Sequence, residues 1–194
     1  MADTLERTSP LQPWADRFAA MTNSVAIAEE PFVTMVDLRT DPAGPGAQAA
    51  AKALGVELPT TASTYAKSVD TTVIWLGPDE WLITGTALGG PELEARLRDA
   101  VGPHGGAAID LSAQRTTLRL SGTHSRDVLA KGCALDLHPQ AFGAGTAAET
   151  MLGQAGVILL AVNGSGDDYR ILVRSTFARY LAEWLLDAAE EYTL

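Results

Sequence analysis

The amino-acid sequence predicts an α+β fold made of two pseudo-repeated strand-helix-hairpin-helix units packed side by side. Residues 32–39 alternate like a half-buried strand, and residues 71–86 contain two apolar runs around a short turn. The same order of patterns returns later, with Val73 and Val157 in corresponding positions about 84 residues apart. Each unit alone would expose one face of a small sheet, so we expect the two units to bury a shared apolar surface.

The first unit begins with the strand at 32–39, which the turn residues DPAGPG at 41–46 interrupt. Residues 47–54 are rich in alanine and predict a helix that stops at Gly55. In the hairpin at 71–86 the turn runs from Gly77 to Glu80, so Trp75 and Trp81 are expected on neighbouring strands.

A second helix of this unit is predicted from residue 90 to Gly102. Pro91 stands at its start, and three apolar residues spaced by four lie on one face, namely Leu93, Leu97 and Val101. Residues 105–112 then predict a short closing strand.

The second unit repeats this order. A strand at 115–122 precedes a helix at 123–132 and a loop at 133–142. Residues 155–174 predict a hairpin whose turn, Asn163 to Asp168, is longer and more flexible. The chain ends in a helix at 175–192, where Ser175 is expected to cap the N-terminus. One face of that helix is expected to carry Phe177, Leu181, Trp184 and Leu185.

Residues 1–31 show no sustained period and are interpreted as an N-terminal arm. Two accounts of the arm remain open: it is a frayed terminus, or Leu11, Trp14 and Phe18 anchor it on a partner. The remaining residues, 32–194, are expected to form a single unit, with halves at about 32–110 and 115–192.

Charge and apolar patterning narrow the classes of function. Lys and Arg number 14 against 24 Asp and Glu, and no run of basic residues occurs, which weighs against a nucleic-acid partner. The longest strongly apolar stretch, residues 155–162, is far below the roughly 20 residues that cross a bilayer, so no membrane partner is expected. The single cysteine, Cys133, and the acidic residues Asp3 and Glu6 near the N-terminus predict a cytoplasmic protein.

No catalytic, cofactor-binding or metal-binding residue is predicted. The three histidines, His104, His124 and His138, lie in different segments without metal-ligand spacing. Cys133 follows a helix-ending glycine and is expected to be a small semi-buried thiol. Gly143-Ala144-Gly145 follows a loop, so the strand-turn-helix context of a dinucleotide site is missing.

Two places carry charged residues with open alternatives. Asp79 and Glu80 lie at the hairpin tip beside Trp81, where they form either a solvated turn or a site for a nitrogenous ring. Arg115 opens the second half close to Asp110, where it either pairs with a carboxylate at the junction or contacts a partner.

Four segments together resemble a known family: WLGPDEWLI at 75–83, DLSAQRTTLRLSG at 110–122, VLAKGCALDLHPQAF at 128–142 and YRILVRSTFARYLAEWL at 169–185. In this order and in a chain of this length, they are similar to the gamma subunit of bacterial heterotetrameric sarcosine oxidase. The resemblance runs from about residue 70 to 190.

This resemblance implies a fold like the folate-binding domain of the glycine-cleavage aminomethyltransferase. It also implies an assembly of alpha, beta, gamma and delta subunits that converts sarcosine to glycine, hydrogen peroxide and methylenetetrahydrofolate. FAD, covalent FMN, NAD and tetrahydrofolate are then expected in the two large subunits and zinc in delta, with no cofactor in this chain. The candidate partner contacts are Trp14, Phe18, Asp79, Glu80, Trp81 and Arg115.

Two other functions remain open at this point. One is an autonomous folate-dependent aminomethyltransferase or folate-using repair factor, which rests on kinship of fold alone. The other is a generic protein-interaction module unrelated to amine oxidation.

Overall fold

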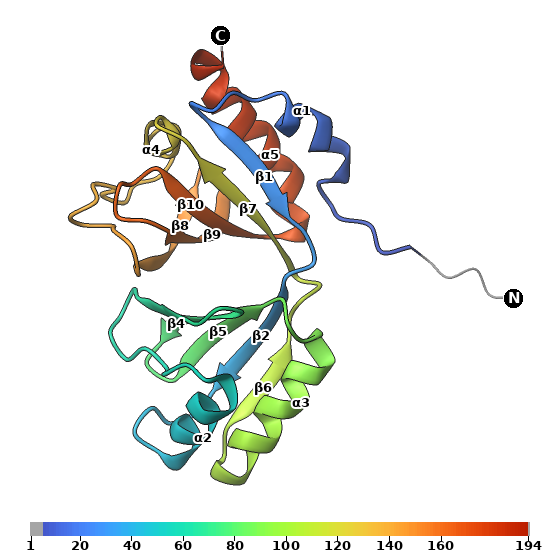
Figure 1. Cartoon of the computed structure of the whole chain (residues 1–194), viewed down its shortest axis with the longest axis vertical. Helices are drawn as coiled ribbons and strands as arrows, with labels where there is room; N and C mark the ends of the chain where they lie inside the picture. The colour runs from blue at the N-terminus through green and yellow to red at the C-terminus, as the bar shows by residue number, and fades with distance from the viewer. Residues whose placement is uncertain (1–5, 194) are drawn as a thin grey trace, which may run out of the picture.

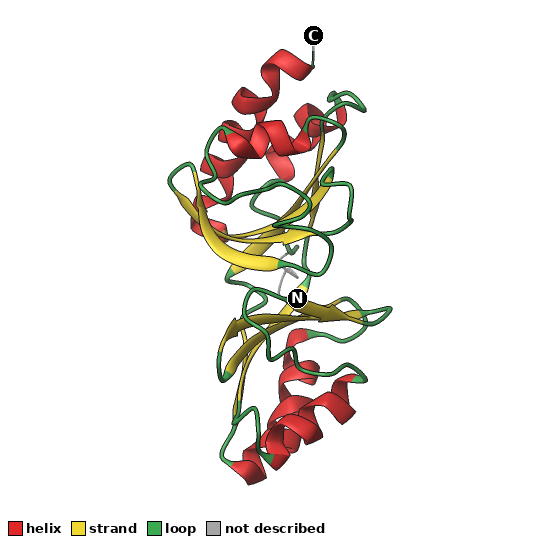
Figure 2. Ribbon diagram, turned by 90° about the vertical axis from the view of Figure 1, so that its left-hand side faces the viewer, coloured by secondary structure: helices red, strands yellow, loops and turns green. Residues whose placement is uncertain are grey.

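The structure, a computed structural model, describes residues 6–193. Two five-stranded antiparallel sheets face each other, and helices cover the outer side of each sheet (Figures 1 and 2). The layers are therefore helix, sheet, sheet and helix, which confirms the predicted α+β fold with two related halves.

The first sheet has the strand order β3-β4-β5-β2-β6. Two helices, α2 and α3, pack on its outer face, and α2 ends at Gly55 in the left-handed conformation, as the sequence predicts. The bounds of these elements are β2 Thr34–Arg39, α2 Pro45–Leu54, β3 Tyr65–Lys67, β4 Thr71–Gly77, β5 Glu80–Gly85, α3 Gly90–Val101, η2 Gly102–His104 and β6 Ala107–Asp110.

The second sheet has the strand order β1-β7-β10-β9-β8. Helices α4 and α5 belong to this half, and a short N-terminal helix lies beside α5 (Figure 1). The bounds are η1 Gln12–Trp14, α1 Ala15–Ala19, β1 Ala26–Glu30, β7 Arg115–Ser121, α4 Ser125–Ala130, β8 Ala147–Leu152, β9 Ala155–Ala161, β10 Asp168–Arg174, α5 Ser175–Ala189 and η3 Glu190–Tyr192.

The two halves exchange their first strands. Along the chain β1 comes just before β2, and β6 comes just before β7, so the two edge strands hold the same place in the repeat. In space, however, β1 pairs with β7 of the other sheet, with Ile27 opposite Leu120. Likewise β6 pairs with β2, with Ala108 opposite Leu38. Each sheet is thus completed by a strand from the other repeat, and a single cut cannot separate the halves.

The interpretation of residues 1–31 as an arm without packed elements is wrong for residues 12–30. These residues form η1, α1 and β1, and Leu11 and Phe18 are buried in the core of the second half. Leu11 and Phe18 therefore anchor the segment on its own chain. The helical turns are too short to show a helical spacing of apolar residues. Strand β1 carries two adjacent glutamates, which interrupt the alternation of apolar and polar residues that predicts a strand. Residues 1–5 of the predicted arm lie outside the described residues.

Three apolar clusters hold the layers together. One lies under the helices of the second half and one under those of the first. The third fills the space between the sheets and confirms the shared apolar surface; it consists of Met35, Ile74, Leu82, Ala147, Ile158, Leu160 and Leu172. Because every described strand of both sheets pairs antiparallel, alternate residues face either the helices or this central layer.

Most predicted elements are confirmed. Trp75 lies opposite Trp81 in the β4-β5 hairpin, and the predicted face of α3 is buried at Leu93, Leu97 and Val101. The edge strands β3 and β8 were missed, because one has three residues and the other alternates without an apolar run.

Two predictions about the last helix are wrong. Ser175 is already inside α5, and its hydroxyl donates to the carbonyl of Ala113 at 3.2 Å instead of capping the helix. Phe177 is 43% exposed, although Leu181 and Leu185 on the predicted face are fully buried. The aromatic ring of Phe177 instead borders a surface groove together with residues of β9 and β10.

Within residues 6–193, none of the helices has the length and apolar character that crossing a membrane requires.

Candidate functional site

The predicted acidic pair at the hairpin tip surrounds one guanidinium. Arg39 lies directly opposite Glu80 in the pairing of β2 with β5, and their side chains form an ion pair. Asp79 and Asp37 each place a carboxylate oxygen 4.0 Å from the same guanidinium. Three acids therefore converge on one cation at the end of the first sheet.

Burial and charge change the protonation of this cluster. Desolvation raises the pKa of Asp37, the negative charge of Glu80 raises it further, and Arg39 acts in the opposite direction. The hydrogen bond that the Arg39 guanidinium donates to Glu80 is the largest cause that raises the pKa of Arg39. The cluster therefore concentrates negative charge that a single arginine balances only in part.

Replacing Asp37 with Asn is expected to remove a pH dependence of stability. The folded-state pKa of Asp37 lies above the ordinary value of 3.8, so its contribution to stability is present below that pH and is lost as the pH rises through the folded-state pKa. The free energy of unfolding of Asp37→Asn minus that of the wild type should therefore increase with pH across this window. Urea titrations between about pH 3.5 and 7 measure it.

The control for this prediction is Asp99→Asn, which removes the same charge from an exposed position on α3. A difference for Asp37→Asn that stays constant, or that decreases with pH, would show that the fold does not raise the pKa of this carboxyl.

Trp81 does not accompany these acids, so the proposed ring site is wrong. Its side chain is fully buried in the core of the first half, and the indole nitrogen donates to the carbonyl of Pro59 at 2.8 Å. Successive residues of a strand point to opposite faces, which separates Trp81 from Glu80. For the same reason the prediction of Trp81 as a partner contact is corrected: it has no exposed surface.

Arg115 joins the acidic cluster from the other sheet. It begins β7, and Asp37 and Glu80 are close enough to influence its titration. The predicted pair with Asp110 does not form, because Ser112 takes that carboxylate: its hydroxyl donates to Asp110 at 2.5 Å and its backbone nitrogen at 2.9 Å. Arg115, Asp79 and Glu80 are thus brought to one side of the molecule.

The other two predicted contacts lie far from this cluster along α5. The indole nitrogen of Trp14 donates to Glu183 at 2.6 Å, and Arg17 pairs with the same carboxylate. Phe18 is only 7% exposed and packs inside, so it is corrected as a partner contact. Trp14, Asp79, Glu80 and Arg115 keep exposed or partly exposed side chains, and their contact with a partner stays a prediction.

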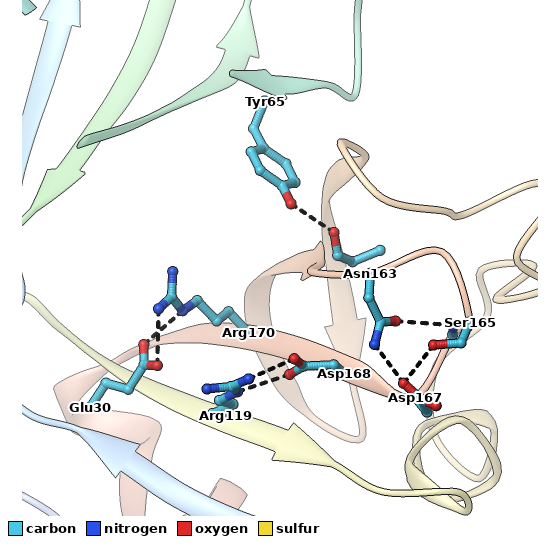
Figure 3. Close-up of polar contacts among 10 residues, drawn as sticks. Glu30, Tyr65, Arg119, Asn163, Ser165, Asp167, Asp168 and Arg170 are labelled. Carbon is cyan, nitrogen blue, oxygen red and sulfur yellow. Dashed lines mark hydrogen bonds and ion pairs between the residues drawn. The ribbon is translucent and has the colours of Figure 1, made fainter. Parts of the chain in front are cut away.

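A cavity of about 300 Å³ opens between the two sheets at another margin. The ion pair of Glu30 with Arg170 forms part of its wall, and the Arg170 guanidinium donates to Glu30 at 3.1 Å (Figure 3). Thr117 also lines the cavity, and its hydroxyl is buried with no hydrogen-bond partner among the described residues. Sequence reasoning missed this cavity, because its residues come from six strands and from neighbouring loops.

Close to the cavity, a polar network fixes the turn between β9 and β10 (Figure 3). Asp167 accepts hydrogen bonds from Asn163 at 2.6 Å and from Ser165 at 2.8 Å, and these bonds lower its pKa. The hydroxyl of Tyr65, from the first sheet, donates to the carbonyl of Ala161 at 2.8 Å. The turn that the sequence predicts as flexible is therefore tied to itself, and the adjoining strand is tied to the opposite sheet.

The side chains gathered at these places offer hydrogen bonds and charge. Among residues 6–193, no three His, Cys, Asp or Glu side chains are grouped closely enough to hold a metal ion. His124 stacks on Tyr192 with ring centroids 4.5 Å apart and contacts Asp127 at 2.9 Å. Cys133 is partly buried, as predicted. The arrangement suits recognition of a polar or charged group.

Comparison with known proteins gives a consistent result along the whole chain. A family model described as "Sarcosine oxidase, gamma subunit family" matches residues 39–191. A sarcosine oxidase subunit gamma from Corynebacterium sp. (strain P-1) is 39% identical over 192 residues, covering 97% of this chain and 93% of that protein. A subunit of the same name from Arthrobacter sp. is 38% identical over 189 residues, covering 96% and 91%.

Solved structures agree with the sequence matches. A chain of the heterotetrameric sarcosine oxidase from Corynebacterium sp. U-96 superposes with a TM-score of 0.89 at 37% identity, covering 97% of both chains. Aminomethyltransferase T of the glycine cleavage system from Bartonella henselae gives a TM-score of 0.62 at 16% identity, covering 89% of this chain and 48% of that one. The second likeness concerns the fold alone and confirms the predicted aminomethyltransferase-like architecture.

Proposed function

The chain belongs to the sarcosine oxidase gamma subunit family, and we propose that it is a non-catalytic subunit that supports assembly of a heterotetrameric sarcosine oxidase. The observation that carries the proposal is the match along 97% of both chains to a chain of such an oxidase. Because the similarity covers nearly the full length of both chains, it favours the same role in a complex for this chain.

In this proposal the partners are a large alpha subunit and beta and delta subunits. The complex oxidatively demethylates sarcosine to glycine, hydrogen peroxide and methylenetetrahydrofolate. FAD, FMN, NAD, tetrahydrofolate and zinc lie in the partner subunits, and this chain supplies none of the reacting groups. The three histidines in separate segments support the placement of zinc elsewhere.

The chain contributes a rigid surface to the complex. Its two sheets are joined through an apolar layer and by the Tyr65 hydrogen bond, so surface groups of both halves are held in fixed relative positions. An obligate contact with the folate-binding-like part of the large subunit should bury more than roughly 2,000 Å². Trp14, Asp79, Glu80 and Arg115 are the proposed contact residues.

The proposal places the complex in the cytoplasm. The single cysteine, Cys133, is unpaired within the described residues, in agreement with a reducing compartment.

Co-expression of the cognate alpha, beta and delta subunits, with and without this chain, tests the function. A stable complex with sarcosine-dependent release of peroxide and formaldehyde is expected only when the chain is present. Assembly and turnover that are unchanged in its absence, together with a monomeric chain that does not bind the other subunits, would contradict the proposal. Binding of tetrahydrofolate by the isolated chain, lost in Asp79→Ala, would favour an aminomethyltransferase-like function instead.

A further inference from the structure

Two arginines lie side by side on the surface that faces the gap between the sheets. Arg115 on β7 and Arg174 on β10 are directly opposite each other in the strand pairing, so their side chains leave the same face of the sheet. Like charges in directly opposed positions of neighbouring strands destabilise a sheet. A pair of this kind needs a compensating negative charge.

The chain itself does not supply an ion pair for either arginine. Within residues 6–193, neither guanidinium lies within 4.0 Å of a carboxylate, although Glu149, Asp37 and Glu80 are near enough to act at longer range. Burial and the charge of Arg174 lower the pKa of Arg115, and they outweigh those carboxylates. The pair therefore retains uncompensated positive charge in a protein whose formal net charge is -10.

The two arginines border a groove of about 330 Å³, which we call the arginine groove. Its lining residues are Arg115, Glu149, Thr150, Gly156, Val157, Ile158, Leu172, Arg174 and Phe177. Gly156 keeps its floor open, since a Cβ at this position would have only the Met151 sulfur as a neighbour, at 4.0 Å.

Exposed apolar side chains flank the arginine groove. Met151, which is opposite Gly156 in the pairing of β8 with β9, is 52% exposed, and Phe177 is 43% exposed. Both are among the few large apolar side chains that the described chain leaves in solvent. Exposed apolar groups beside an uncompensated charge are typical of a protein interface whose partner is absent.

We propose that the arginine groove binds a segment of the large partner subunit that carries a carboxylate, which lies between Arg115 and Arg174, and an apolar side chain, which packs on Phe177 and Met151. This inference rests on the proposed function and assigns the groove to its interface. Two neighbouring guanidinium groups suit a carboxylate, because each can donate charge-assisted hydrogen bonds to it.

Two variants test the groove by different means. Arg174→Glu reverses one charge, and Gly156→Val fills the floor with a side chain that strands tolerate. Arg96→Glu is the matched control, because it makes the same charge change on an exposed part of α3, which covers the outer face of the other sheet. Affinity of each full-length variant for the cognate large subunit is measured by calorimetry, and thermal unfolding confirms that each variant is folded.

We expect Arg174→Glu to weaken the association about 30-fold or more, as removal of one partner from a buried charge pair does. Gly156→Val should weaken it as well, and Arg96→Glu should leave it unchanged. Wild-type affinity in both groove variants would overturn the inference while leaving the proposed function intact. No association of the wild-type chain would instead contradict the function itself.

Two further outcomes would also overturn the inference. If acetate or succinate raises the unfolding temperature of the isolated wild-type chain but not of Arg174→Glu, while the complex assembles normally, the groove is a small-anion site. If the isolated chain dimerises and Arg174→Glu abolishes only that dimer, the occupant is a second copy of the chain.

Discussion

Deletion of residues 1–31 is expected to unfold the second half of the chain. The deletion removes β1, whose five residues pair along β7, and with it the side chains of Leu11, Phe18, Val25 and Ile27, all of which are buried. Each buried apolar side chain contributes about 1.5–3 kcal/mol, so the combined loss rivals the 5–15 kcal/mol that stabilises a typical domain. The newly exposed edge of β7 also offers unpaired backbone groups for aggregation.

Hydrogen exchange measures this outcome separately in each half. Amides of β10 and α5 should lose protection in the truncated chain, whereas those of β4, β5 and α3 should retain more of it, because the first half keeps its own apolar cluster. The matched control is deletion of residues 1–8, which leaves Leu11 and the buried Ser9 in place. Its unfolding midpoint should stay close to that of the full chain.

Equal protection of β10 in the 1–31 deletion and in the full chain would contradict the prediction. That result would mean that β1 adds little to the sheet, and it would favour the account of residues 1–31 as a frayed terminus.

The sequence predicts the elements whose local pattern of apolar and turn residues is distinctive. The hairpins at 71–86 and 155–174 have long apolar runs around recognisable turns, and both are present. Helix α3 shows its apolar face through spacing alone. Strands β1, β3 and β8 are edge strands whose stability comes from pairing with distant residues, and local patterning does not encode that pairing.

The same distinction applies to the candidate sites. Sequence reasoning selected Asp79, Glu80 and Arg115 because charged residues at turns and junctions stand out locally. It missed Arg174, because only the pairing of β10 with β7 brings that side chain beside Arg115. It also predicted Trp81 as a partner contact, because an aromatic residue adjacent to two acids resembles a recognition site. Only the structure shows that the Trp81 side chain points to the core, on the face of the strand opposite to Glu80.

Replacement of Trp81 by alanine is expected to destabilise the protein by about 3–5 kcal/mol. The side chain is fully buried among the residues that α2 and α3 cover, and no neighbouring group can fill the space of an indole without moving the helices. Trp75→Ala is the matched control, because Trp75 lies opposite on β4 and is only partly buried. It should cost clearly less in urea unfolding.

Trp81→Phe separates the hydrogen bond from the packing. It keeps an aromatic ring but removes the donor to the Pro59 carbonyl, so we expect a smaller loss of about 1–3 kcal/mol. Affinity for the large subunit, measured on folded Trp81→Phe, should equal that of the wild type, since a residue with no exposed surface cannot touch a partner. A variant with unchanged stability and weakened association would reverse this assignment and return Trp81 to the interface, which requires the β4-β5 hairpin to open when the subunits meet.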